Sequence, residues 1–309
     1  MIPLVVIVGP TASGKTALSI EIAKRLGGEI VSADSMQVYK QMNIGTAKPD
    51  EEEKQGIAHH LIDVVDIGDD FSVNSFAKMA HAKIRDIYIK GKLPILVGGT
   101  GLYTDVVVYN TKLSEDSFDV SVRKRLEGVL LNEGREKLYD MLCHVDAPAA
   151  EKLHVNDVKR VMRALEIYYN TGKTKTYLDS ISNAAPKIYN SITFGISYER
   201  ERLYERINMR VDKMMENGLL QEVEALSKTP GFLSSTAGQG IGYKEIIYYL
   251  NGTATYDEAV RILKRDTRRL AKRQLTWFRK NKDIIWLDGE REFGEMVNEC
   301  IGYIEKTLK

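Results

Sequence analysis

The sequence has little cysteine and no long apolar run. Its 309 residues include 2 cysteines, Cys143 and Cys300, which are too few for a disulfide framework or a zinc site with four cysteine ligands. No stretch approaches the roughly 18 apolar residues that span a bilayer, and the first residues lack the basic segment of a signal peptide. We therefore expect a protein of the reducing cytoplasm, with no membrane span and no structural metal.

Net charge is also nearly absent, but the charged residues are unevenly placed. The whole chain carries a formal charge of +1. Residues 261–282 nevertheless hold ten Lys or Arg and a single acidic residue, Asp266, so the remainder of the chain is net negative. A strongly basic segment on an otherwise acidic chain predicts a polyanionic partner.

Short apolar runs alternate with helical patterns in the first third of the chain. The runs predict buried strands, and apolar residues spaced three and four apart predict helices. We expect strands at residues 4–9, 29–33 and 94–99 and helices at 14–26 and 72–90. This alternation is typical of an α/β fold, here a P-loop NTPase-like parallel sheet flanked by helices.

The pattern changes after about residue 113. Residues 117–172 show helical periodicity without a strand signal, which predicts an all-helical insertion domain at 114–189. The core domain would then comprise residues 1–113 and 190–309. In its second part we expect strands at 191–197 and 284–287, and helices at 200–217, 219–228, 242–250 and 256–281.

The first strand leads into a glycine-rich segment that matches the P-loop pattern G-x4-G-K-[ST]. Glycines let such a loop wrap so that its amides point at phosphate oxygens, and the following helix adds its positive N-terminal end. The lysine supplies a point charge, and the threonine hydroxyl is a ligand for Mg²⁺. We therefore predict diphosphate or nucleotide binding, with Thr16 as the metal ligand, by Gly9, Pro10, Thr11, Ala12, Ser13, Gly14, Lys15 and Thr16.

The strand at 94–99 is followed by no carboxylate of the kind that holds Mg²⁺ in most ATPases and GTPases, because its end reads Gly98-Gly99-Thr100. The acid expected closest to the phosphates is instead Asp34, which follows the strand at 29–33. Ligands of open α/β sheets bind at this edge. Asp34 is thus placed to contact a nucleophile, and a role as a turn or N-cap residue is the alternative.

Several segments together resemble the tRNA dimethylallyltransferases, also called tRNA isopentenyltransferases. They are GPTASGKTALSIEIA at 9–23, SADSMQVYKQMNIGTAKP at 32–49, HHLID at 59–63, LVGGTGLY at 96–103, VKRVMRALE at 158–166, GYKE at 242–245 and TRRLAKRQLTWFRK at 267–280. The resemblance extends from residue 4 to about residue 288. It is to the bacterial type, because the zinc finger of eukaryotic members has no counterpart in the sequence.

The resemblance implies transfer of a dimethylallyl group from dimethylallyl diphosphate to N6 of the adenosine 3′ of the tRNA anticodon, with release of diphosphate. The P-loop would bind the donor's diphosphate together with Mg²⁺, and Asp34 would be the catalytic base that takes a proton from N6. Thr100 and Arg210 would stabilise the leaving group. Arg206 lies one helical turn from Arg210 and could share or take its role.

The resemblance also implies three groups of residues that contact tRNA through its anticodon stem-loop. The group at the flipped adenosine is Asp34, Ser35, Met36, Gln37 and Thr100, with Gln37 acting through its amide. The group in the insertion is Arg123, Lys159, Arg160, Val161, Met162 and Arg163. The third group is Gln239, Gly240, Ile241, Gly242, Tyr243 and Lys244. The basic segment would bind phosphates, and we expect the protein to be a monomer.

Other functions stay open on the residues alone. A small-molecule kinase also pairs a P-loop with an acid after the second strand. A prenyltransferase acting on free adenine nucleotides would share the donor site but would not need the basic segment, and a non-catalytic RNA-binding protein would not need Asp34. Two further pairs have structural interpretations: His59 and His60 lack a third metal ligand, and Trp277 and Phe278 are expected to pack their helix against the sheet.

Overall fold

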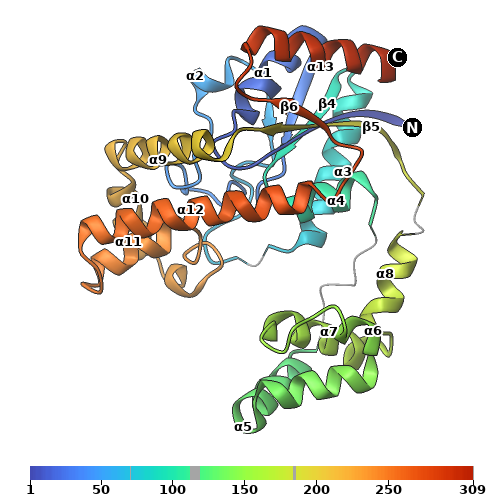
Figure 1. The fold of residues 1–309 in the computed structure, drawn as a ribbon, viewed down its shortest axis with the longest axis vertical. Helices are drawn as coiled ribbons and strands as arrows, with labels where there is room; N and C mark the ends of the chain where they lie inside the picture. The colour runs from blue at the N-terminus through green and yellow to red at the C-terminus, as the bar shows by residue number, and fades with distance from the viewer. Residues whose placement is uncertain (70, 112–118, 184–185, 309) are drawn as a thin grey trace. The chain divides into compact units, whose positions relative to one another are not determined.

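The computed structural model describes residues 1–69, 71–111, 119–183 and 186–308. It divides into two compact units (Figure 1), a core unit of residues 1–108 and 188–309 and a helical unit of residues 109–187. The sequence placed the limits of the core at residues 113 and 190. Residue 113 lies outside the described residues, and the strand that re-enters the core begins at Tyr189, one residue before the expected limit.

A six-stranded, wholly parallel sheet forms the centre of the core unit, in the order β3-β2-β4-β1-β5-β6. Its strands are β1 Ile2–Val8, β2 Gly28–Ser32, β3 His59–His60, β4 Leu93–Gly98, β5 Tyr189–Ser197 and β6 Ile285–Asp288. Val5 of β1 pairs with Ile95 on one side and with Ile192 on the other. The central strand is buried on both faces, which explains its continuous apolar run.

Helices cover both faces of this sheet (Figure 1). Helices α1 (Lys15–Leu26) and α13 (Phe293–Leu308) pack on one face, where Val5 and Ile7 join their apolar side chains in a core. Helices α3 (Val73–Ile89) and α4 (Gly101–Val108) contact the strands from the other side. The predicted α/β fold is confirmed. Helix α13 and the two-residue strand β3 were not predicted.

A layer of further helices lies beyond the carboxyl ends of the strands in the core unit. Helices α9 (Arg200–Glu216) and α12 (Tyr256–Phe278) lie side by side there (Figure 1). The shorter elements are α2 Glu51–Lys54, α10 Leu219–Ser227, the 3-10 turn Phe232–Ser234 and α11 Tyr243–Leu250. Helices α10 and α11 share a second apolar core with residues 36–44, so that segment is tied to them.

The helical unit consists of α5 (Val120–Val145), α6 (Ala147–Ala150), α7 (Val158–Thr171) and α8 (Lys175–Asn183). It has its own core, in which Leu126, Leu138 and Leu142 of α5 pack against α7. Gly134 interrupts α5 with φ 86° and ψ 175°, a conformation that glycine adopts without strain. In the described part of the chain, no helix combines the length and the apolar character needed to cross a membrane.

Candidate active site

The P-loop connects β1 to α1 and wraps as its glycines require. Gly14 has φ 88°, and Gly9 approaches the neighbouring strand so closely that an added Cβ would lie 2.9 Å from Ser13 Oγ and 3.1 Å from the Ile196 carbonyl oxygen. Gly14 caps α1 without a side chain that could bind the first helical amides. These amides therefore point into the loop, where they can bind an anion.

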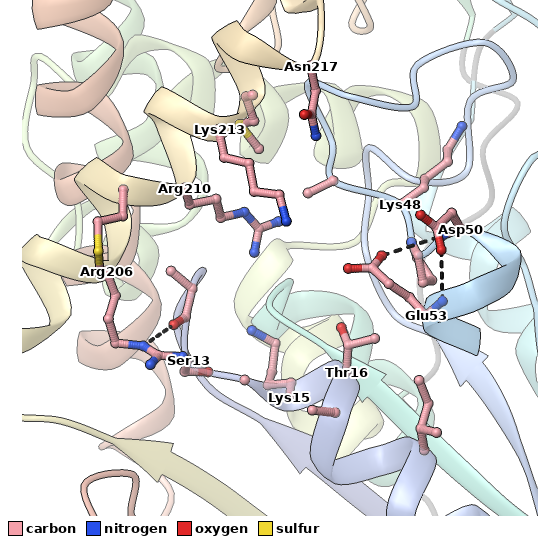
Figure 2. A pocket seen from close by; sticks show the side chains of 18 of the residues that line it. Ser13, Lys15, Thr16, Lys48, Asp50, Glu53, Arg206, Arg210, Lys213 and Asn217 are labelled. Atoms are coloured by element: carbon pink, nitrogen blue, oxygen red, sulfur yellow. Dashed lines mark hydrogen bonds between the residues drawn. The ribbon is translucent and has the colours of Figure 1, made fainter. Parts of the chain in front are cut away.

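Two cations face the space above the P-loop. Figure 2 shows Lys15 pointing up from α1 and Arg210 pointing from α9 toward the same space. Burial, together with the charge of Arg210, lowers the pKa of Lys15 to about 7. Burial also lowers the pKa of Arg210, and its buried Nε has no hydrogen-bond partner among the described residues. A pair of enclosed like charges favours an anion between them.

Arg206 has a different environment from Arg210. Its Nε donates to the Ala12 carbonyl oxygen at 2.9 Å (Figure 2), and its guanidinium lies 4.7 Å from the centre of the Tyr198 ring. Arg206 thus fastens the P-loop to α9, whereas Arg210 keeps its Nε available. Both arginines line the same cavity. The sequence had left open whether Arg206 shares or takes the role of Arg210.

Two cavities meet at Lys15 and Thr16. The larger has a volume of about 810 Å³ and is lined by the P-loop, by α9 and by residues 43–55, with Arg206, Arg210 and Lys213 in its wall. The smaller, of about 50 Å³, is lined by Asp34, Gln37, His59 and the two glycines at the end of β4. Lys15 and Thr16 line both cavities. A cavity with cations in its wall and a carboxylate therefore lie on the two sides of one lysine.

Asp34 follows β2 and is held in a fixed turn. Its Oδ1 accepts hydrogen bonds from the amides of Met36 at 2.9 Å and Gln37 at 3.3 Å. Its Oδ2 has no hydrogen bond among the described residues. The turn interpretation and the catalytic interpretation of Asp34 are thus compatible, because one oxygen shapes the turn and the other is available to a ligand.

Thr100 lies beside this turn because β2 and β4 are neighbours. Its hydroxyl accepts a hydrogen bond from the Ser35 amide at 3.1 Å and donates to Ser35 Oγ at 3.3 Å. A Cβ on Gly98 would lie 2.1 Å from the Ala33 carbonyl oxygen, so only glycine permits this approach. The structure thus brings together Asp34, Ser35 and Thr100, three residues that the sequence assigned to one site.

The Gln37 amide is fully occupied in this structure. Its Oε1 accepts from Ser32 Oγ at 3.1 Å, and its Nε2 donates to the carbonyl oxygens of Thr46 and Ala47, both at 3.3 Å. An adenosine could bind this amide only in exchange for one of these bonds. Through these hydrogen bonds, Gln37 stabilises the loop that forms part of the wall of the larger cavity.

Comparison with known proteins identifies the family. A sequence model described as IPP transferase matches residues 37–281. A curated tRNA dimethylallyltransferase from Acetivibrio thermocellus is 54% identical over 285 residues, which are 92% of this chain and 91% of the relative. The chain belongs to the IPP transferase family. The resemblance seen in the sequence is thereby confirmed.

Further relatives match nearly the whole of this IPP transferase family member. The tRNA dimethylallyltransferase from Carboxydothermus hydrogenoformans is 48% identical over 96% of both chains. The crystal structure of a tRNA isopentenylpyrophosphate transferase from Bacillus halodurans is similar with a TM-score of 0.74 at 43% identity, covering 100% of this chain and 98% of that one. A eukaryotic dimethylallyltransferase, described as acting on tRNA, gives a TM-score of 0.85 at 30% identity, covering 99% and 80%.

The two adjacent histidines have structural partners in this family member. His59 Nδ1 lies 2.9 Å from the Ile57 carbonyl oxygen, and His60 Nε2 lies 2.7 Å from Glu29 Oε2. Within the described ranges, no group of three or more His, Cys, Asp or Glu side chains could hold a metal ion.

The Thr16 hydroxyl has no hydrogen bond among the described residues, so its oxygen is available. A single hydroxyl oxygen beside the P-loop fits Mg²⁺, which commonly takes few protein ligands and several phosphate oxygens.

The residues of the helical unit expected at tRNA divide by their burial. Lys159, Arg160 and Arg163 are exposed on α7. Val161 and Met162 are only 0% and 5% exposed, in the core of the unit. Contrary to expectation, these two side chains therefore cannot contact RNA in this structure. Because successive residues of a helix point in different directions, one segment of α7 contains both exposed and buried residues. Arg123 is already engaged, because its Nη1 lies 2.8 Å from Glu166 Oε1.

The segment 239–244 shows the same division. Gln239 is exposed, but Gly240, Gly242 and Tyr243 are buried, and the Tyr243 ring is fully enclosed in the second core. The Tyr243 side chain therefore cannot contact RNA in this structure, because α10 and the 43–47 loop cover it. Lys244 and Ile241 are half-buried.

The end of α12 contains a functional candidate that sequence reasoning did not assign. Gln274 Oε1 accepts from the Thr11 amide at 2.9 Å, and its Nε2 donates to the Gly99 carbonyl oxygen at 3.0 Å. The neighbouring Trp277 packs on Gly101 and donates to Asp105 Oδ2 at 2.8 Å, so it packs its helix against α4 and not against the sheet as expected. Gln274 lies in a segment that carried the resemblance, but only its contacts reveal what it does.

Proposed function

We propose that this protein transfers the dimethylallyl group of dimethylallyl diphosphate to N6 of the adenosine 3′ of the anticodon in tRNA and releases diphosphate. The observation that carries the proposal is the meeting of the two cavities at Lys15 and Thr16, with cations in one and Asp34 in the other. The names of the relatives, tRNA dimethylallyltransferase and tRNA isopentenylpyrophosphate transferase, supply the substrate class.

The donor's diphosphate occupies the P-loop in this proposal. The loop amides, Lys15 and Arg210 converge on it, and Arg206 holds the loop in shape. As the bond between carbon and the bridging oxygen breaks, negative charge develops on the diphosphate. Fixed cations and amide dipoles stabilise that charge in the transition state more than in the ground state.

Thr16 would hold Mg²⁺, and the ion would neutralise part of the charge of the diphosphate. Thr16 is the protein ligand, and its hydroxyl is free of other hydrogen bonds among the described residues. This arrangement needs no carboxylate after β4, where the chain reads Gly98-Gly99-Thr100.

The adenine amine enters from the side of Asp34. An exocyclic adenine amine is a weak nucleophile, because its lone pair is delocalised into the ring. Asp34 Oδ2 accepts a hydrogen bond from N6–H and takes the proton as the C–N bond forms. Thr100 positions this carboxylate indirectly through the Ser35 amide. The base must leave the anticodon stack to reach this position.

The exposed basic side chains bind the phosphates of the tRNA in this proposal. Lys159, Arg160 and Arg163 contribute from the helical unit, and α12 contributes Lys272 and Arg273, both exposed and without an ion pair in the described part of the chain. Gln239, before α11, and Lys244, in the first turn of α11, contribute as well. The protein would act as a cytoplasmic monomer.

Mass spectrometry of an anticodon stem-loop with a run of adenosines tests the proposal. After incubation with the protein, dimethylallyl diphosphate and Mg²⁺, we expect the mass of one dimethylallyl group on the adenosine 3′ of the anticodon. AMP as the acceptor and γ-labelled ATP as the donor are the controls. Turnover only on AMP would favour the free-nucleotide prenyltransferase, and consumption of ATP with an acceptor would favour the kinase.

A further inference from the structure

A carboxylate of helix α10 fills a nest of three consecutive backbone amides. Glu222 Oε2 accepts from the amides of Asn43 at 2.9 Å and Ile44 at 2.8 Å, and Glu222 Oε1 accepts from the amide of Gly45 at 3.0 Å. Successive amides that point to one spot form an anion-binding concavity. Here the anion belongs to the protein, and it fixes a loop 177 residues earlier in the chain.

The same carboxylate is bound from the opposite side by Tyr243. The Tyr243 hydroxyl donates to Glu222 Oε1 at 2.7 Å, and burial together with Glu222 raises the pKa of Tyr243 far above its usual range. The Tyr243 ring lies against Gly45, where an added Cβ would be 2.5 Å from a ring carbon. Glu222 thus joins the start of α11 to the 43–45 amides.

The loop held by Glu222 reaches the acceptor side of the site. Directly after the nest, the carbonyl oxygens of Thr46 and Ala47 accept the hydrogen bonds of Gln37 Nε2. The backbone N–H of Gln37 in turn donates to Asp34 Oδ1. A shift of the loop would therefore be transmitted to the turn that holds the catalytic carboxylate.

The loop also reaches the donor side. Asn43, Ile44, Ala47 and Lys48 line the larger cavity opposite α9. The stretch 43–48 therefore forms part of the wall of the diphosphate-binding space and also supports the Gln37 side chain. No other carboxylate in the described residues binds the 43–45 amides.

We propose that Glu222 is a positioning residue for both substrates, because it fixes the 43–47 loop between the diphosphate cavity and the Asp34 turn. The inference rests on the proposed function for its kinetic consequence, but the contact itself can be measured separately. A glutamine at this position keeps the size of the side chain and replaces one acceptor oxygen by a donor that faces backbone amides.

Hydrogen exchange and diphosphate binding by Glu222→Gln test the contact without catalysis. We expect faster exchange of the amides of residues 43–45, with unchanged exchange in β1 and α3. We also expect the dissociation constant for inorganic diphosphate to rise about tenfold, which is the size of effect expected when hydrogen bonds to a charged group are weakened. Glu224→Gln on the same helix is the matched control, because its side chain binds only Lys228 among the described residues. Unchanged exchange at 43–45 or unchanged diphosphate binding would overturn the proposal.

Turnover distinguishes this inference from the proposed function. In Glu222→Gln we expect kcat to fall about tenfold at saturating donor and stem-loop, whereas a purely structural role would lower the melting temperature and leave kcat of the folded fraction unchanged. Should Glu222→Gln fail to fold, Tyr243→Phe keeps the nest and removes one bond to the carboxylate, and the same readouts apply with a smaller change. An inactive wild type would refute the proposed function, and the exchange and binding measurements would still decide the role of Glu222.

Discussion

Gln274 and Thr11 form a hydrogen bond across 263 residues of sequence, with the Thr11 amide donating to Gln274 Oε1 at 2.9 Å. The other end of the same side chain donates to the Gly99 carbonyl oxygen, and a Cβ on Gly99 would lie 2.4 Å from Gln274 Nε2. One amide group of the basic helix α12 therefore spaces the P-loop from the turn that precedes Thr100. The helix expected to bind RNA phosphates also fixes the loop expected to bind the diphosphate.

Replacement of Gln274 should impair donor binding more than stability. In Gln274→Glu, a carboxylate faces the Gly99 carbonyl oxygen and brings negative charge toward the phosphate site. We expect kcat/KM for dimethylallyl diphosphate to fall about tenfold to a hundredfold, from the lost pairing and the repulsion of a diphosphate. Steady-state kinetics at saturating stem-loop measure this change. Thr276→Ala, on the exposed side of α12, should leave kcat/KM unchanged, and an equal effect in both variants would argue against the role of Gln274.

Asp34→Asn should separate the turn from the chemistry. An asparagine keeps an Oδ1 that can accept from the amides of Met36 and Gln37, so the turn and the fold should persist. The side chain can no longer take a proton from N6, and we expect kcat to fall by about 10²–10⁴-fold, the usual contribution of a general base. Single-turnover assays with quantification of the modified stem-loop measure this loss.

The affinity for inorganic diphosphate is the control for Asp34→Asn, and it should not decrease, because the P-loop cations are untouched. Full prenylation by the variant would remove Asp34 from the mechanism. Loss of diphosphate binding together with turnover would instead mean that the substitution disturbed the P-loop.

The sequence predicted those parts of the molecule that local patterns determine. Apolar runs located five of the strands, and the P-loop and Asp34 were placed because glycine and strand-end positions act locally. The strand β3 was not predicted, since two residues are too short for a periodic signal. Glu222 and Gln274 escaped prediction for another reason: the backbone groups that they bind lie 175 to 263 residues away, and only the fold brings them together.

Some residues were assigned to the RNA contact only because they lie in a segment that carried the resemblance. The helix period explains which of them are buried instead. In the segment 159–163, Lys159 and Arg160 are exposed, whereas Val161 and Met162 are turned into the helical unit. The apolar character of the two buried residues could have indicated this division before the structure. For Tyr243 the sequence offered no such signal, because tyrosine is common both at RNA surfaces and in cores.

The pH dependence of donor binding should follow Lys15. Its pKa lies at about 7 in the free protein, lowered by burial first and by Arg210 second. As pH rises through this value the free protein loses the Lys15 charge, and binding of a diphosphate must then take up a proton. If only the protonated form binds, we expect KM for the donor to rise about tenfold per pH unit above pH 7. Donor KM measured from pH 6 to 9 checks this, and a flat profile would contradict it.

Arg210→Gln tests the cause of the lowered pKa. Removing a neighbouring cation relieves the repulsion, so the pKa of Lys15 should rise and the pH at which donor KM begins to increase should shift upward. Donor affinity at pH 6 should fall at the same time, because one phosphate-binding cation is lost. Calorimetric titration of inorganic diphosphate in buffers of different ionisation enthalpy reports proton uptake at Lys15, which should decrease at pH 8 in this variant.

Binding of the stem-loop should depend on salt through the exposed cations of α12. Lys272 and Arg273 have no ion pair in the described part of the chain, whereas Lys264 is paired with Asp212 at 2.6 Å. In Lys272→Ala/Arg273→Ala we expect weaker stem-loop binding and a slope of log K against log[salt] that is smaller by about 0.7 for each lost contact with single-stranded phosphate. Titrations of a labelled stem-loop between low and moderate salt measure this slope. Lys228→Ala, which removes an exposed lysine from the C-cap of α10, should leave the slope unchanged. A double variant with the slope of the wild type would move the phosphate contacts away from this part of α12, because counterion release counts only the charges that the RNA neutralises.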